Sequence, residues 1–200
     1  MWTTVSDSPH DHEREALAWL RSRLPDREPY HVWTNFEFTT HNGQLYEVDA
    51  LAITDNGFHL IEVKSHPGTI AGDAGTWEWT TPEGRFRQFD NPRILTNRKA
   101  KALKGLIESS KAFKKHRSSV PYLTESVFLS DPNLCCDLNP QGRHHVFGRD
   151  AQPGEALPPE RAKLGGIVEH LIGLGPASTG RARHRIQRQV VERLVRAIDQ

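Results

Sequence analysis

Residues 46–65 read YEVDALAITDNGFHLIEVKS and predict a β-hairpin. Two apolar runs flank Asn56-Gly57, a dipeptide typical of two-residue hairpin turns. A turn at this dipeptide pairs Asp49 with Lys64 and leaves apolar side chains on both faces of the hairpin. Strands that are apolar on both faces are typical of the middle of a covered sheet. The stretch therefore predicts the centre of a layered α/β domain.

Three charged side chains gather at the end of this hairpin that lies far from its turn. Because side chains alternate along a strand, Asp49, Glu62 and Lys64 are expected on one face. Cross-strand neighbours lie within roughly 5 Å, so two carboxylates can hold one divalent cation with a lysine beside it. This pattern indicates metal-dependent phosphodiester hydrolysis. The alternative is an ordinary ion pair between Asp49 and Lys64, with Glu62 solvated at the rim of the sheet.

Mg²⁺ chemistry explains why these residue types are needed together. Magnesium prefers one or two carboxylates and keeps several waters, which leaves positions open for a phosphate oxygen and a nucleophilic water. Asp49 and Glu62 are the expected ligands. The Lys64 ammonium is expected to orient the attacking water or to offset charge that builds on the phosphorus.

An amphipathic helix is predicted upstream of the hairpin. Ser8 and Pro9 are typical of an N-cap and a first helical residue. An apolar stripe follows at helical spacing, consisting of Ala16, Leu17, Leu20 and Leu24. Extended backwards, this stripe reaches Glu13, which is expected to face the sheet and to supply a third, water-mediated metal contact. The alternative is that Glu13 is a favourable acid in the first turn of a helix.

The order of these elements resembles the core of the PD-(D/E)XK nucleases and, more narrowly, the nuclease-related domain called NERD. The matching stretches are EREALAWL at 13–20, EVDALAI at 47–53, FHLIEVKSHPGTIAGDAGTWEW at 58–79, and the Asn-Pro of 91–92 before a basic helix. The resemblance is greatest to the N-terminal domains of bacterial phage-defence serine/threonine kinases of the phage-growth-limitation and BREX type.

The resemblance implies a mixed α/β fold of the PD-(D/E)XK type and DNA cleavage with Mg²⁺ or Mn²⁺. It implies that Asp49 and Glu62 are metal ligands, assisted by the backbone carbonyl of Val63. It also implies that Lys64 is the catalytic lysine and Glu13 the glutamate of the first helix. One position departs from the family pattern, because Leu95 stands where the family often has a glutamine. This departure leaves open a DNA-sensing or docking module that cleaves weakly or not at all.

The predicted helix after Pro92 is strongly basic. Residues 93–117 hold nine Lys and Arg against one acid, Glu108. An inward stripe is expected from Leu95, Ala102, Leu103, Leu106 and Phe113, with Lys111 and Lys115 among the residues on the opposite side. Phosphate contacts are expected from Arg93, Asn97, Arg98, Lys101 and Lys104. The alternative is an ordinary solvated helix face.

Composition is consistent with a cytoplasmic protein. The chain has 200 residues and a net charge near +1. Its two cysteines are adjacent, which suits neither an unstrained disulfide nor a zinc site. There is no signal-peptide pattern and no apolar run long enough to span a membrane, and no small-molecule cofactor is expected.

Residues 1–150 are expected to form the nuclease-related domain, with further strands at 120–130 and 144–147. Residues 151–200 are expected to form a helical extension with helices near 164–172 and 186–198. This extension is expected to lead into a kinase domain beyond this chain and to provide a homodimer interface. Its arginine-rich part, 181–196, is a second candidate DNA contact, with a solvated helix face as the alternative.

Overall fold

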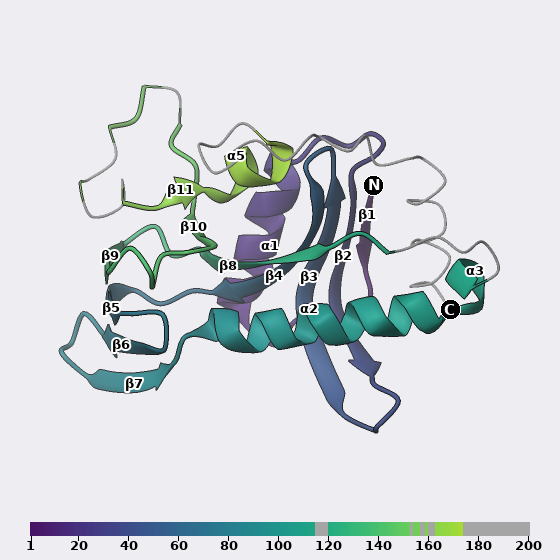
Figure 1. Cartoon of the computed structure of the whole chain (residues 1–200). Coiled ribbons are helices and arrows are strands. Elements are labelled where there is room, and N and C mark those ends of the chain that lie inside the picture. The colour runs from purple at the N-terminus through teal and green to yellow at the C-terminus, as the bar shows by residue number, and fades with distance from the viewer. Residues whose placement is uncertain (115–119, 153, 157–158, 160–162, 174–200) are drawn as a thin grey trace.

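The computed structural model of the chain describes residues 1–114, 120–152, 154–156, 159 and 163–173. Two mixed sheets dominate these residues (Figure 1). The first has the strand order β1-β2-β3-β4-β8-β10-β11 and consists of β1 (Trp2–Thr4), β2 (His31–Thr39), β3 (Leu45–Thr54), β4 (Gly57–Lys64), β8 (Leu123–Leu129), β10 (Val146–Gly148) and β11 (Gly165–Gly166). The second has the order β7-β6-β5-β9 and consists of β5 (Gly68–Gly72), β6 (Thr76–Thr80), β7 (Phe86–Asp90) and β9 (Leu134–Leu138).

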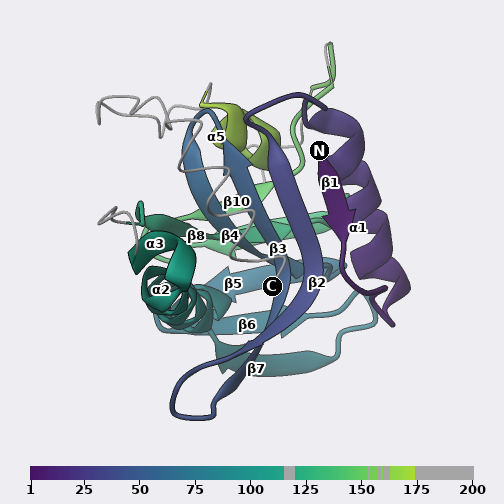
Figure 2. The same cartoon turned by 90° about the vertical axis from the view of Figure 1, so that its right-hand side faces the viewer.

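Helices cover both faces of the first sheet. Figure 2 shows α1 (Asp11–Arg23) on one face and α2 (Pro92–Ser109) with α3 (Lys111–Lys114) on the other. A short helix, α5 (Ile167–Ile172), packs near the hairpin turn that joins β3 to β4 (Figure 1). The predicted mixed α/β class is confirmed, and the hairpin lies in the middle of the covered sheet.

The predicted hairpin is present, but its turn lies one residue earlier than expected. Thr54 pairs with Gly57, so the turn residues are Asp55 and Asn56. Two contacts stabilise this turn: the Asn56 N–H donates to Thr54 Oγ1 at 3.1 Å, and the Asn56 side-chain amide donates to the carbonyl of His170 at 2.8 Å. Each β3 residue therefore pairs with a β4 residue two positions earlier than predicted. Because this shift is even, every side chain stays on its predicted face.

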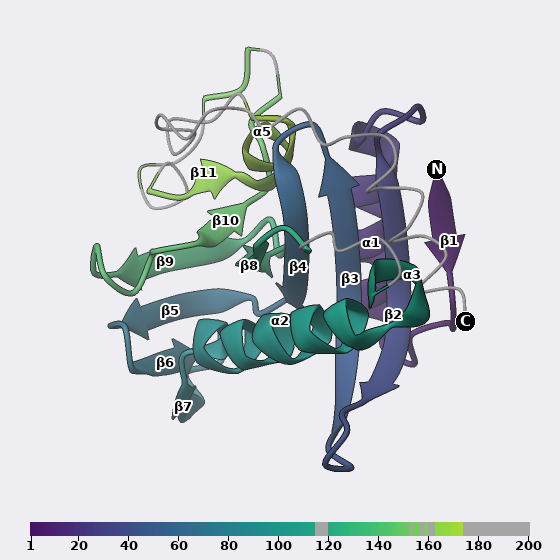
Figure 3. The same ribbon diagram turned by 45° about the vertical axis from the view of Figure 1, so that its right-hand side comes forward.

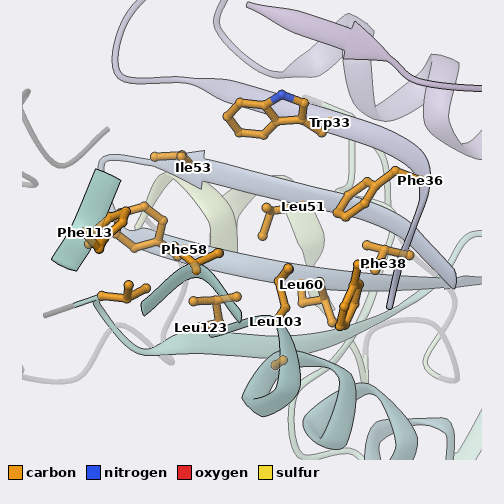
Figure 4. Packing of buried hydrophobic residues seen from close by; sticks show 14 residues of the cluster. Trp33, Phe36, Phe38, Leu51, Ile53, Phe58, Leu60, Leu103, Phe113 and Leu123 are labelled. Atoms are coloured by element: carbon orange, nitrogen blue, oxygen red, sulfur yellow. The ribbon is translucent and has the colours of Figure 1, made fainter. Parts of the chain in front are cut away.

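The α2 face of the sheet holds an apolar core. Leu51, Ile53, Phe58 and Leu60 from the hairpin pack there with Leu103 and Phe113, as Figure 4 shows. The predicted inward stripe of the helix is wrong at Leu95, whose exposed fraction is 45%. The buried positions of α2 are instead Thr96, Lys99, Ala100, Leu103 and Ile107. Packing of Leu103 and Ile107 against the sheet sets this rotation of the helix, and it brings position 99 inward.

The α1 face holds a second apolar core, and its predicted helical stripe is confirmed. Ala16, Leu17 and Leu20 are buried against Ala50 and Ile61 of the hairpin. The helix begins at Asp11, not at Pro9, and its N-cap is His10. The expected cap role of Ser8 is therefore wrong, because the Ser8 hydroxyl accepts the His10 N–H at 3.1 Å and donates to Glu13 instead.

The later predicted strands are also present. The strand expected at 120–130 is β8, which pairs in parallel with β4, and β10 then pairs in parallel with β8. Helix α5 lies within the segment expected at 164–172, whereas the helix expected at 186–198 and the arginines of 181–196 lie outside the described residues. In the part of the chain that the structure describes, no helix is long and apolar enough to cross a membrane.

Candidate metal centre and nucleic-acid interface

The candidate site lies where β3 and β4 stop pairing. The last paired residues are Ala50 and Ile61, and continuing the register places Asp49 opposite Glu62. Beyond this point, the backbone N–H of Val63 donates to Asp49 Oδ2 at 2.7 Å. The next carbonyl along the strand, that of Lys64, faces β8, because it accepts the Ser130 N–H at 2.9 Å. Backbone direction alternates along a strand, so the Val63 carbonyl points to the Asp49 side.

Two lysines hold the carboxylate of Glu62. Lys64 Nζ lies 2.8 Å from Glu62 Oε1, and Lys99 Nζ lies 2.7 Å from Glu62 Oε2. Glu62 and Lys99 are only 8% and 7% exposed. Lys64 extends from the end of β4, and Lys99 reaches Glu62 from α2, which crosses that end of the strand (Figure 3). The ion pair of Lys64 is thus formed with Glu62 and not with Asp49.

Electrostatic effects differ sharply between the two carboxylates. Burial and the neighbouring charge of Glu62 raise the pKa of Asp49 to about 7, although the Val63 N–H partly offsets them. Burial opposes ionisation of Glu62 too, but the Lys64 and Lys99 ammonium groups outweigh it and hold the pKa of Glu62 below its ordinary value. Burial opposes the charge of Lys64, and the ion pair with Glu62 outweighs that effect and raises the pKa of Lys64.

Glu13 lies on the same side of the site as Asp49. Both residues line a cleft of about 300 Å³ that is rich in acidic side chains, including Glu37 and Glu47. The Ser8 hydroxyl donates to Glu13 Oε2 at 2.8 Å and holds it at the start of α1. The structure therefore brings the predicted Glu13 next to Asp49, while Glu62 lies deeper, under α2.

The oxygen atoms at this site suit a hard divalent cation. Carboxylates and a backbone carbonyl are the ligands that Mg²⁺ and Mn²⁺ prefer. Within the described residues, no group of three or more His, Cys, Asp or Glu side chains is arranged to hold a metal ion. The donor set that fits is thus the carboxylate pair of Asp49 and Glu62 with the Val63 carbonyl. Desolvation and the charge of Glu62 raise the pKa of Asp49, and a cation between the two carboxylates would offset both effects.

The basic residues of α2 divide into two groups. Arg93 and Asn97 face inward, and Arg93 Nη1 lies 2.9 Å from Oε1 of Glu125, a residue that is only 2% exposed. The second group lies on the outer side of the helix. Arg98 and Lys101 are exposed, and Lys104 Nζ lies 3.7 Å from Glu108 Oε1. The expected set of phosphate contacts is therefore not a single surface, because two of its five members are engaged beneath the helix.

Glu125 forms a second buried charge centre on the α2 face. His145 Nδ1 lies 3.3 Å from Glu125 Oε1, and Tyr122 donates to Glu125 Oε2 at 3.4 Å. Burial opposes ionisation of this carboxyl, but hydrogen bonding and charge from His145, with hydrogen bonding from Asn97, lower its pKa to about 2. This network anchors the first turns of α2 on β8 and so positions Lys99 over Glu62.

Lys99 was missed by the sequence-based site prediction, although a signal for it exists. Lys99 lies four residues before Leu103 and eight before Ile107, so it falls on the buried stripe of an ideal helix. Its positive charge instead favoured a prediction of solvent exposure, because lysine is rarely buried without a partner. The partner, Glu62, is 37 residues away in the sequence.

A family model described as the nuclease-related domain matches residues 8–129, a span that contains Glu13, the hairpin and α2. The chain belongs to the nuclease-related domain family. This nuclease-related domain is 37% identical over 149 residues to a Streptomyces coelicolor protein named probable kinase PglW. The expected likeness to a phage-growth-limitation kinase is confirmed. The alignment covers 74% of this chain and 9% of the relative. No solved structure matches the chain.

Proposed function

We propose that this chain is a Mg²⁺- or Mn²⁺-dependent DNA endonuclease or nickase of the PD-(D/E)XK type. The observation that carries the proposal is the placement of Asp49 opposite Glu62 at the end of the hairpin, with Lys64 beside them. The raised pKa of Asp49, about 7, supports the same conclusion, because a bound cation stabilises the charge of a partly buried carboxylate opposite a second one.

Each residue of the site has a proposed role. Asp49 and Glu62 hold the metal, with the Val63 carbonyl as a further ligand and Glu13 acting through a water. Mg²⁺, when bound, supplies Lewis acidity toward a phosphate oxygen and a water of lowered pKa. Lys64 positions the attacking water and offsets negative charge on the phosphate. The Glu62 ion pair keeps the Lys64 ammonium at the site.

DNA is proposed to lie along the exposed face of α2. Arg98 and Lys101 are exposed on α2, the helix that covers Glu62, and are proposed to hold the phosphate backbone on its solvent side. Lys104 is proposed as a weaker contact because Glu108 lies nearby. Arg93 and Asn97 are proposed to act indirectly, by fixing the start of the helix on Glu125.

The wider protein is proposed to be a cytoplasmic phage-defence protein that carries a serine/threonine kinase. The support is the similarity to a relative named as a kinase, of which this chain spans about a tenth. Residues 1–150 are proposed as the nuclease-related domain and 151–200 as an extension that leads to the kinase and forms a homodimer. A monomeric mass in solution at working concentration contradicts the dimer.

A second candidate function is a DNA-sensing or docking module that regulates the attached kinase without cutting. One observation favours it: both oxygens of Glu62 are bound by lysines. The exposed Leu95 also stands where the resemblance implies a glutamine. The two functions differ in their dependence on Lys64, because only hydrolysis needs an ammonium beside the reacting phosphate.

The experiment that separates them is plasmid cleavage. Supercoiled DNA is incubated with wild type, Lys64→Ala or Asp49→Ala in Mg²⁺ or Mn²⁺, with an EDTA lane. Lys163→Ala is the matched control, because it removes an exposed lysine that pairs with Asp137 far from the site. Metal-dependent nicking by wild type and the control, lost in both site variants, supports the nuclease. Equal cleavage by wild type and Lys64→Ala rejects it, and binding without cleavage favours the sensing module.

A further inference from the structure

Lys99 is a buried lysine at the candidate metal centre. Its side chain leaves the covered face of α2, and its ammonium lies 2.7 Å from Glu62 Oε2. A buried ammonium is strongly disfavoured unless it is paired, and so is a buried carboxylate. Each of these two residues therefore makes the burial of the other tolerable. This contact allows α2 to cover the end of β4.

The same contact has a consequence for any cation at the site. Glu62 has two carboxylate oxygens, and an ammonium is bound to each of them. A metal ion that binds Glu62 must displace one lysine or share an oxygen with it. Lys64 is 31% exposed in its side chain and has room to move, whereas the Lys99 side chain is 8% exposed and packed under the helix. Lys99 is therefore the residue that continues to compete with a metal ion for the Glu62 carboxylate.

We propose that Lys99 is a positioning residue that holds Glu62 when metal is absent and weakens the binding of Mg²⁺ or Mn²⁺. This inference rests on the proposed metal-dependent function. Together the ammonium groups of Lys64 and Lys99 offset the charges of Asp49 and Glu62 and so weaken the attraction of this carboxylate pair for a cation. Without Lys99, the carboxylates outnumber the ammonium groups and attract the cation more strongly.

The test is the affinity of the full chain for Mn²⁺, measured by titration calorimetry without DNA. Lys99→Met removes the charge and keeps an unbranched side chain of similar length. The expected result is tighter binding, by about tenfold. Lys163→Met is the matched control: it removes the same charge from an exposed position that has no role in the proposed site, where solvent screens it, and it is expected to leave the affinity unchanged.

A double-variant comparison separates competition from a purely structural role. In a Glu62→Gln background, Lys99→Met is expected to raise the Mn²⁺ affinity much less than in the wild-type background, because no Glu62 carboxylate is left for Lys99 to compete for. Lys99→Gln is the second variant, in case Lys99→Met does not fold. Circular dichroism in EDTA checks folding before each titration.

The outcomes are distinguishable. Tighter Mn²⁺ binding by Lys99→Met or Lys99→Gln, with most of this gain lost in the Glu62→Gln background, supports the inference. Wild-type binding with equal or weaker binding by folded Lys99 variants overturns the inference alone and leaves the proposed nuclease intact. Absence of Mn²⁺ binding in both wild type and variants overturns the inference together with the proposed metal-dependent function.

Discussion

The Asp49 carboxylate accepts the Val63 N–H at 2.7 Å, directly beyond the last pair of the β3–β4 ladder. A side-chain oxygen thus takes the place of a backbone carbonyl at the point where the strands separate. The separation leaves the Val63 carbonyl on the Asp49 side of β4, and the hydrogen bond holds the Asp49 carboxylate at the end of the ladder, where Glu62 is the opposite residue. The same contact that ends the sheet therefore assembles the candidate metal centre.

Asp49→Asn is expected to stabilise the protein and to abolish cleavage. Asparagine keeps an oxygen that accepts the Val63 N–H but removes a partly buried charge opposite Glu62. We expect a gain of about 1 kcal/mol in the free energy of unfolding in EDTA, or about 2–4 °C in the melting temperature. Thermal melts of wild type and variant at pH 8 measure this change. A lower melting temperature for the variant contradicts the prediction.

The double variant Arg98→Ala/Lys101→Ala is expected to weaken DNA binding without loss of stability. Both side chains are exposed, so their removal leaves no buried partner unpaired. If each neutralises one phosphate, the slope of log affinity against log salt concentration falls by about 2. Fluorescence anisotropy with a short duplex at several salt concentrations measures the slope, and an unchanged slope removes this face of α2 from the interface.

Arg93→Ala is expected to behave in the opposite way. Its guanidinium is paired with the buried Glu125, so the variant loses stability, by about 2–3 kcal/mol, more than it loses salt-dependent affinity. Urea unfolding and the same anisotropy titration compare the two losses. If the slope of log affinity against log salt concentration falls by about 1 and the midpoint of urea unfolding is unchanged, Arg93 is a direct phosphate contact instead.

The Glu125 network predicts acid sensitivity. The folded-state pKa of about 2 lies below the ordinary value of 4.5, so the unfolded chain takes up this proton first as pH falls. Its stabilisation is therefore present above about pH 4.5 and is lost progressively as pH falls toward 2. Glu125→Gln lacks this titration, so the stability difference between wild type and variant is expected to shrink between pH 6 and pH 3. Urea unfolding at each pH measures it, and a constant difference contradicts the assignment.

Gly68 is expected to be irreplaceable where the chain leaves β4 and enters the second sheet. Its φ is +100°, and an added Cβ falls 2.2 Å from the Thr80 carbonyl oxygen. Gly43 is the matched control, with φ +82° and open space around the added atom. Gly68→Ala is expected to lose at least about 2 kcal/mol more than Gly43→Ala, because it adds a backbone collision to the same conformational strain. Equal losses in urea unfolding contradict this account.

The hairpin and its faces were predictable because they depend on local periodicity. Alternation along 46–64 predicted Asp49, Glu62 and Lys64 on one face. This prediction does not depend on the turn, which lies one residue earlier than expected. The turn itself was not predictable, because the Asn56 amide is held by His170, 114 residues away in the sequence. The start of α1 was missed for a different, local reason, since the hydroxyl of Ser8 binds Glu13 and does not cap the helix.

The sequence by itself determined the family, the mixed α/β class, and the charged residues at the end of the hairpin, because each of these follows from neighbouring residues and their spacing. Only the tertiary structure decided which charges meet. Lys99 reaches Glu62, and Arg93 reaches Glu125, through the rotation of α2 on the sheet. That rotation follows the buried stripe of Leu103 and Ile107, but the carboxylates that it meets lie on strands distant in the sequence, so no local pattern identifies them as the partners.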